Sequence, residues 1–450
     1  DPVACHGAAG ALGMEASLWL QPDAGLALVA LDPAWTVEAH DSDRFHDVVR
    51  AWSALVAGAL VDDDDGAEDS TGDRPTGPLL LGGFGFWPEP ARTPTWAGFE
   101  AARLSVPSLL LTVTPGGVWL TASLLRDPSP NRDRAAQAHV ADLTARWRTV
   151  LAAAGASSPV DAHGDLGALE VNADVPDVPD AREWRATVAR LAGAVGRGRI
   201  DKAVLARRQD LVADAPIEIP AVLRRLAASA PESTIFAFSR AGRTFVGATP
   251  ERLARSVDRE FTTIALAGSI GRGADPAEDD ELAAALLASE KDREEQAVVV
   301  DRLREVLAPI TDRLDIPARP SVVRLRHIQH LASRISGTLS ERAGVLDLVE
   351  RLHPTPAVGG APRELALELL AAEERLERGW YAGPVGWVDR NGDGEFVVAI
   401  RSGVIEGRSA SLFAGCGIVA DSEPEREWVE SQIKLRTLAS ALGEVRTWPT

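Results

Sequence analysis

Apolar and polar residues alternate along several stretches of the chain with the period of two that indicates half-buried strands. Residues 16–32 predict two short strands around a turn, and residues 108–125 predict a β-hairpin across Pro-Gly-Gly. Residues 233–257 predict a second hairpin, which is closed at Ala-Gly. Further strands are expected at 78–90, 202–212, 260–273 and 321–339, with a three-strand antiparallel meander at 383–421.

Helical segments separate these strands. A long helix is expected at about 277–306, and the last helix begins near Glu425. Other helices are expected at 132–154, 182–196, 344–354 and 362–377. Antiparallel hairpins interleaved with helices favour an α+β fold over a doubly wound parallel sheet.

Two segments carry loop-like sequence. Residues 62–78 are acidic, contain Gly and Pro and lack apolar periodicity, which is typical of an exposed loop. Residues 155–181 are rich in Pro and Asp. We therefore place the main boundary near residue 180, between an N-terminal part, 1–180, and a second part, 181–445, of the same fold.

Composition and charge limit the possible partners. The chain has 450 residues, of which 45% are hydrophobic and 25% charged, so it can bury a large core. Its formal net charge of −19 disfavours nucleic acid and anionic membranes as partners. No apolar run approaches the roughly 20 residues that cross a bilayer. An anionic substrate requires local cations or a metal. The oligomeric state is not fixed by the sequence, and we expect a monomer.

The N-terminal segment lacks the basic start and long apolar centre of a signal peptide. It also lacks an initiator Met, so we expect further residues upstream. The two cysteines, Cys5 and Cys416, form neither a disulfide framework nor a zinc pattern. We therefore expect a cytoplasmic location.

Lysine is rare in this chain, and its few positions are informative. Of 47 basic residues, only Lys202, Lys291 and Lys434 are lysines. Drift toward arginine spares lysines that Arg cannot replace, since Lys can be deprotonated and Arg cannot. Lys202 stands at the head of an apolar strand, where the alternative is a strand-end lysine that reaches solvent.

Two predicted helices carry carboxylate pairs with the same spacing. Asp292 and Glu295 lie on one helix, and Glu427 and Glu430 lie on the last helix. Each pair shares a helix face, and alone it is usually a solvated surface. Together the pairs could hold a hard cation such as Mg²⁺, but periodicity cannot show that they converge.

Other motifs have structural alternatives. "DRNGDGEF" at 389–396 imitates a calcium loop, but its twelfth position would be Ile400 instead of a bidentate Glu, so we predict a hairpin turn. A histidine placed like His330 is more often a core residue than a ligand. A cysteine placed like Cys416 is more often a small buried residue than a nucleophile. Tyr381, the only tyrosine, lies at a Gly/Pro-rich turn.

Six segments, taken together and in order, resemble the chorismate-binding enzyme family. They are "SEKDREEQ" (289–296), "HLASRISGTL" (330–339), "LHPTPAVGGAP" (352–362), "RGWYAGPVGW" (378–387), "GDGEFVVAIRSG" (392–403) and "AGCGIVADSEPEREWVESQIK" (414–434). The likeness covers about residues 180–445 and is loose before residue 180. Departures are few: Gln296 stands where many relatives have His, and Cys416 where many have Ala.

The resemblance implies a single large α+β domain with two antiparallel sheets packed face to face, helices outside, and a site between the sheets. It implies a Mg²⁺-dependent reaction on chorismate. Glu295 and Glu430 would bind the metal directly, and Asp292 and Glu427 would hold its waters. Lys202 matches the family's general base. Glu251 matches its general acid.

The resemblance also implies a substrate-binding set. Lys434 and Arg401 would contact the substrate carboxylates, with Tyr381 beside them, and His330 would touch the ring region. Backbone groups near four residues would complete the anion site: Gly268, Ser269, Gly415 and Gly417. Lys291 receives no role.

Two positions discriminate among family members. Lys202 suits activation of water, because members that use ammonia commonly lack a lysine there. Ala357 stands where members that also eliminate pyruvate typically have Thr, so the pattern resembles that of isochorismate synthases. Salicylate synthase and a catalytically silent chorismate-binding protein are the alternatives. The product could feed menaquinone or siderophore biosynthesis, and the sequence does not decide between them.

Overall fold

The computed structural model describes residues 1–61, 75–125, 132–156, 168–171, 177–324 and 328–445. This description does not extend to a few side chains inside helices and strands, including those of Ser269, Lys291 and Glu295. Most of the expected loop at 62–78 and of the segment at 155–181 lies outside the described residues.

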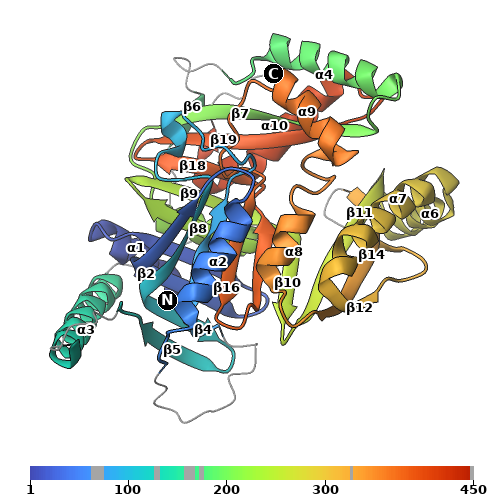
Figure 1. Ribbon diagram of the computed structural model, residues 1–450. Helices are drawn as coiled ribbons and strands as arrows, with labels where there is room; N and C mark the ends of the chain where they lie inside the picture. The colour runs from blue at the N-terminus through green and yellow to red at the C-terminus, as the bar shows by residue number, and fades with distance from the viewer. Residues whose placement is uncertain (62–74, 126–131, 157–167, 172–176, 325–327, 446–450) are drawn as a thin grey trace.

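Hydrogen bonds join the strands into one network that is antiparallel except for the pair β6–β20 (Figure 1). In order of pairing, the first arm contains β7 (Lys202–Ala213), β19 (Ser409–Ile418), β18 (Ser402–Glu406), β9 (Arg243–Thr249), β8 (Thr234–Arg240), β1 (Ala16–Gln21) and β2 (Leu26–Ala39). The second arm contains β4 (Ala102–Thr114), β3 (Leu79–Phe84), β16 (Pro384–Asp389), β17 (Gly394–Val398), β10 (Arg252–Val257), β11 (Glu260–Gly271) and β14 (Ile328–Leu339). The arms meet where β2 pairs with β4.

Short strands extend this network. They are β5 (Gly117–Ala122), β6 (Ala168–Val171), β12 (Thr311–Asp315), β13 (Ser321–Arg324), β15 (Gly360–Ala361) and β20 (Glu444–Val445). Strands from both sides of residue 180 pair directly, since β1 pairs with β8 and β3 with β16. The proposed division of the chain at residue 180 stays a prediction.

Large aromatic side chains from both arms belong to one buried core. Phe238 of the first arm and Phe84 and Phe396 of the second belong to one buried cluster. Trp380 is fully buried in this cluster, and its ring centroid lies 5.5 Å from that of Phe238 and 5.3 Å from that of Phe99. Burial of such side chains is a dominant source of folding stability. The expected α+β class is confirmed.

Helices cover the outer faces of the network. They are α1 (Pro2–Ala11), α2 (Arg44–Val56), α3 (Arg132–Ala156), α4 (Ala181–Gly196), α5 (Ile219–Ser229), α6 (Pro276–Ala288), α7 (Glu290–Leu307), α8 (Val345–Leu352), α9 (Arg363–Glu373) and α10 (Pro424–Leu442). Figure 1 shows α4, α9 and α10 together beside β7 and β19, and α6 and α7 beside β11 and β14. No helix in the described ranges is long and apolar enough to cross a membrane.

The hairpins at 16–32, 108–125 and 233–257 are confirmed, and so is the turn between β16 and β17. The single long helix expected at about 277–306 is wrong. The chain forms α6 and α7, with Ser289 extended between them (ψ 116°). Ser289 Oγ accepts a hydrogen bond from the Asp292 N–H, so this serine begins a new helix as its N-cap.

Two strand predictions are also wrong. Residues 321–339 form two strands, because β13 turns back to pair with β14 instead of continuing into it. The region 383–421 forms two hairpins, β16–β17 and β18–β19, instead of a three-strand meander. Arg401, between the hairpins, has a φ of 53°. The chain there leaves β17, which pairs with β10, and enters β18, which pairs with β9.

Candidate active site

Lys202 is the first residue of β7 and lies between two neighbouring strands. β7 pairs with β19, where Ala203 stands opposite Ile418, and with β15, where Lys202 stands opposite Ala361. A β carbon at Gly417 would lie 2.5 Å from Lys202 Cε and 3.1 Å from its Nζ. Because glycine has no side chain, position 417 leaves room for the Lys202 side chain to cross β19.

Glu251 follows β9 and is held by backbone and side-chain contacts. Its carbonyl accepts a hydrogen bond from the Val398 N–H at 3.0 Å, and Thr355 Oγ1 donates to its Oε1 at 3.5 Å. Burial raises the pKa of Glu251, and the positive charges of Lys202 and Arg401 oppose that rise. Lys202, Glu251 and Arg401 thus share one electrostatic environment, in which burial favours the protonated carboxyl.

Tyr381 and Lys434 meet at Gly415. The Tyr381 ring is buried and stacks on Phe413, with 5.4 Å between the ring centroids. A β carbon at Gly415 would lie 3.1 Å from the Tyr381 hydroxyl oxygen, and Lys434 Nζ donates to the Gly415 carbonyl at 2.8 Å. Burial raises the pKa of Tyr381, so the phenol is neutral. Residues from β19, α10 and the segment before β16 therefore come together here.

Helix α10 contributes a carboxylate cluster. The ligand atoms of Cys416, Glu427 and Glu430 all lie within 4.8 Å of one another. Glu427 accepts a hydrogen bond from Ser422 Oγ at 2.8 Å, and Lys434 Nζ lies 2.6 Å from Glu430 Oε1. Burial and the negative charge of Glu430 raise the pKa of Glu427. A cation between the two carboxylates would relieve their mutual repulsion.

The chemistry of this cluster fits a hard divalent cation. Carboxylate oxygens are the protein ligands that Mg²⁺ prefers. The Cys416 thiol is buried, and burial raises its pKa to about 12; a protonated thiol is a poor ligand for this hard cation. Glu427 and Glu430 are the described residues that fit Mg²⁺ best.

Gly268 brings helix α7 close to the second arm. The register of β11 against β14 shifts between Ala267 and Ser269, which leaves Gly268 in a bulge with a φ of 71°. A β carbon at Gly268 would lie 2.9 Å from Asp292 Cβ. Glycine therefore satisfies both the left-handed backbone and the close approach of Asp292.

His330 lies next to this bulge, opposite Ser269 in the β11–β14 ladder. Burial lowers the pKa of His330, and the positive charges of Lys202 and Lys434 lower it further, while a hydrogen bond to the Gly268 backbone opposes them. His330 is therefore neutral near neutral pH. Its electrostatic interaction with both lysines connects the second arm to the first.

Gln296 fixes α7 to the sheet. This buried side chain donates from Nε2 to the Ala265 carbonyl and to Ser333 Oγ, both at 3.1 Å. The side chain of Glu295, on the same helix, lies outside the described residues. Among the side chains described, Asp292 does not join the α10 cluster, so the convergence of the two carboxylate pairs stays a prediction.

Ala357 is exposed in the turn between α8 and β15. The Gly359 N–H closes this turn by donating to the Thr355 carbonyl at 2.9 Å. Gly360 then pairs with Ala203 of β7. The turn therefore lies directly beside the strand that begins at Lys202.

Two side chains that contact the predicted residues were missed by sequence reasoning. Thr355, bonded to Glu251, lies inside the quoted "HPTPAVGG" motif, so its hydroxyl could have been considered. Ser422, bonded to Glu427, precedes α10 without any distinctive pattern.

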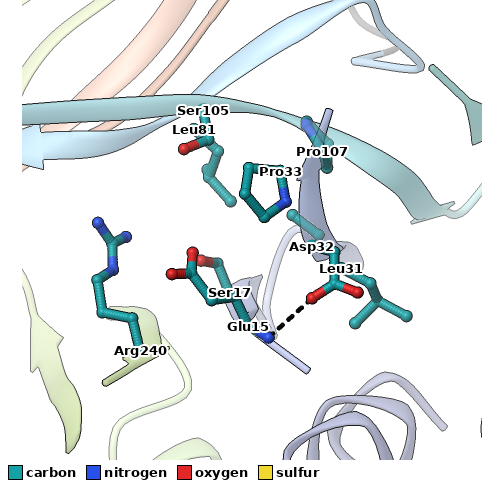
Figure 2. A pocket seen from close by; sticks show the side chains of 10 residues that line it. Glu15, Ser17, Leu31, Asp32, Pro33, Leu81, Ser105, Pro107 and Arg240 are labelled. Atoms are coloured by element: carbon teal, nitrogen blue, oxygen red, sulfur yellow. Dashed lines mark hydrogen bonds between the residues drawn. The ribbon is translucent and has the colours of Figure 1, made fainter. Parts of the chain in front are cut away.

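A small cavity elsewhere lies apart from these residues. It is lined by Glu15, Asp32 and Arg240, among others, between β1, β2 and β8 (Figure 2). None of the predicted site residues lines this cavity. A hollow along α10 does include Glu430 in its lining, together with the exposed Val429 and Ile433.

Comparisons with known proteins agree with this geometry. A family model described as "Chorismate binding enzyme" matches residues 1–443. The chain is 36% identical over 439 residues to isochorismate synthase MenF of Bacillus subtilis, covering 95% of this chain and 88% of that protein. It is 36% identical over 445 residues to the salicylate biosynthesis isochorismate synthase of Pseudomonas aeruginosa, covering 99% and 88%.

Among solved structures, the menaquinone-specific isochorismate synthase MenF of Escherichia coli matches with a TM-score of 0.74 at 26% sequence identity. The match covers 95% of this chain and 88% of that chain.

Gly268→Ala tests the contact between the bulge and α7. The added methyl would face Asp292 and would require a left-handed alanine, so we expect a loss of about 1–3 kcal/mol in the free energy of unfolding. Gly271→Ala is the matched control, because a β carbon at Gly271 meets no atom within 4 Å. Denaturant unfolding of both variants measures the difference, and equal stabilities would contradict this account of Gly268.

Proposed function

The chain belongs to the chorismate-binding enzyme family, and we propose that within this family it is an isochorismate synthase, which converts chorismate reversibly to isochorismate with Mg²⁺. The observation that carries the proposal is the electrostatic coupling of Lys202 to Glu251, because burial raises the pKa of the Glu251 carboxyl. A base and an acid that act on one ring are what the exchange of one hydroxyl for another requires.

Lys202 is the general base of the proposed reaction. In its deprotonated form, the Lys202 amine takes a proton from the water whose oxygen forms a bond to C2 of chorismate. The ring double bonds shift toward C4, where the carbon–oxygen bond breaks. Because Lys202 is fixed between β15 and β19 and passes over Gly417, its amine is held at a defined place before substrate arrives.

Glu251 is the general acid. It gives its proton to the C4 hydroxyl, which leaves as water, so one water enters and one departs. The raised pKa supplies a protonated donor at a pH where an exposed glutamate would be ionised. Thr355 orients the carboxyl through its bond to Oε1. In the reverse direction the two groups exchange roles.

Glu427 and Glu430, with Asp292 and Glu295 from α7, would hold the Mg²⁺. When bound, this ion supplies positive charge to a substrate carboxylate in a protein of strongly negative net charge. Ser422 orients Glu427, and Lys434 neutralises Glu430 through their 2.6 Å contact.

The remaining residues of the proposed site bind and orient chorismate. Arg401 and Lys434 contact its carboxylates, with the neutral phenol of Tyr381 beside them. His330 faces the ring as a neutral imidazole. Backbone groups near four glycine and serine positions complete the anion site: Gly268, Ser269, Gly415 and Gly417.

Ala357 supports a reaction that stops at isochorismate, since this exposed methyl offers no hydroxyl to assist pyruvate elimination. The pathway that uses the product, the monomeric state and a cytoplasmic location stay predictions from the sequence.

The experiment that tests the proposed function is incubation of the purified protein with chorismate and Mg²⁺, with chromatographic separation of the products. We expect an equilibrium mixture of chorismate and isochorismate that EDTA abolishes. Salicylate with pyruvate would overturn the argument from Ala357. Bound chorismate without turnover would establish a binding protein instead.

Lys202→Ala and Lys202→Arg test the base. Both variants should lose about 10²- to 10⁴-fold in kcat, because alanine has no amine and arginine stays protonated. Both variants should still bind chorismate, which can be measured by the quenching of tryptophan fluorescence. Substantial turnover by the arginine variant would remove proton transfer from the role of Lys202.

The pH dependence of kcat/KM tests the acid. Burial raises the folded-state pKa of Glu251 above the ordinary 4.5, so the protonated form is lost as pH rises through that higher value. The profile should therefore have a limb that falls toward alkaline pH. Glu251→Gln, which cannot donate a proton, should reduce activity and remove this limb. An unchanged profile in Glu251→Gln would contradict the assignment.

A further inference from the structure

Glu374 and Arg378 form a buried ion pair behind the proposed site. Only 2% and 1% of the two side chains are exposed. Arg378 donates from Nε to Glu374 Oε1 at 2.6 Å and from Nη2 to Oε2 at 2.7 Å. A paired charge is expensive to bury unless its remaining hydrogen-bonding groups are also satisfied, so the other contacts of this pair are informative.

Those contacts are with the backbone of β7 and of the turn before β15. Arg378 Nη2 donates to the Val204 carbonyl at 2.5 Å, and Nη1 donates to the Val358 carbonyl at 2.9 Å. Glu374 Oε2 accepts from the Ala206 N–H at 2.9 Å. The guanidinium also lies 4.0 Å from the centroid of the Phe86 ring.

The pair fills a gap between the backbone partners along one edge of β7. β19 pairs with the other edge from Ala203 to Val212, whereas on this edge β15 pairs with Lys202 and Ala203, Val178 with Arg208, and β6 with residues 211–213. Beyond β15, the Val204 carbonyl accepts a hydrogen bond from the Arg378 guanidinium, and the Ala206 N–H donates to the Glu374 carboxylate. A donor and an acceptor thus continue the hydrogen-bond pattern that a longer β15 would provide.

Each contacted segment carries a residue of the proposed site. Val204 lies two residues after Lys202, and Val358 directly follows Ala357. Tyr381 lies three residues after Arg378. One rigid ion pair therefore ties together the backbones that carry the base, the turn and the tyrosine.

We propose that Glu374 and Arg378 are a positioning pair, which sets the place of Lys202 relative to the turn at Ala357 without touching the substrate. The inference rests on the proposed function. Arginine is required, because a planar fork can bond the carboxylate and two carbonyls at once, whereas lysine cannot. Glutamate is required, because glutamine would turn an N–H₂ group toward either the guanidinium or the Ala206 N–H.

The test compares Glu374→Gln and Arg378→Lys with the wild type after circular dichroism has shown that each is folded at the assay temperature. We expect kcat to fall about 10- to 100-fold, because small displacements of a catalytic group have effects of this size. KM for chorismate should change less than kcat, and the affinity for Mg²⁺ should stay within about twofold, since the pair contacts neither α10 nor Arg401.

Glu15→Gln is the control at a more exposed carboxylate–arginine pair. It removes a carboxylate that accepts two hydrogen bonds from Arg103, at 3.0 and 3.2 Å, and that lies outside the proposed site. Its kcat should stay within about twofold of wild type. A merely structural role for Glu374 would lower the unfolding temperature but leave kcat of the folded enzyme unchanged, and that result would overturn the proposal.

Backbone hydrogen exchange gives a readout that does not need activity. Exchange at Ala206 and in the turn at 355–360 should accelerate in Glu374→Gln and stay unchanged in Glu15→Gln. If the wild type makes no isochorismate, the proposed function fails, and the exchange data alone decide whether the pair holds β7 to the turn. Unchanged exchange at both places would overturn the positioning role.

Discussion

The position of β7 is the constraint on which the rest of the proposed site depends. Ten residues of β7 pair with β19 in unbroken register, from Ala203 opposite Ile418 to Val212 opposite Ser409. Because a slip of one residue would turn every side chain to the opposite face, this ladder decides where Lys202 points. The short β15 and the buried Glu374–Arg378 pair hold the other edge near Lys202. Lys202, the proposed base, is therefore positioned by the backbone hydrogen bonds of its strand.

Charge is the second organising feature. The chain carries a net charge of −19, yet the positive charges of Lys202 and Arg401 act on Glu251, and those of Lys202 and Lys434 act on His330. The two effects of burial are opposite and both useful: it raises the pKa of Glu251 and lowers that of His330. Burial thus favours the protonated form of Glu251 and the neutral form of His330, while Lys434 lies against the Glu430 carboxylate of α10. An overall acidic surface is compatible with an anionic substrate when the field is reversed locally.

Much of the fold could be predicted because period-two alternation and turn residues are local signals. The hairpins were of this kind, and so was the turn that imitates a calcium loop. Strand pairing is not a local property of the sequence. The change at Arg401 from a strand that pairs with β10 to one that pairs with β9, and the pairing of β13 with β14, could therefore not be predicted. The break at Ser289 could have been found, since "SEKD" places a capping serine three residues before an acidic side chain.

The site residues were predicted by resemblance to a family, and not by periodicity. Lysine and tyrosine are rare in the composition, and this rarity distinguishes Lys202 and Tyr381. The reason for Gly417 was not visible, because the approach of Lys202 across β19 requires the register. Glu374 and Arg378 were invisible for another reason: their spacing of four is common on exposed helices, and only their burial distinguishes them.

In the proposed reaction, water activated by Lys202 enters at C2. The most direct measurement is to run the reaction in water labelled with heavy oxygen and to locate the label in isochorismate by mass spectrometry and NMR. We expect labelled oxygen in the C2 hydroxyl of isochorismate made by the wild type. Isochorismate that retains only unlabelled oxygen would show that the hydroxyl moves within the substrate, and the roles given to Lys202 and Glu251 would be wrong.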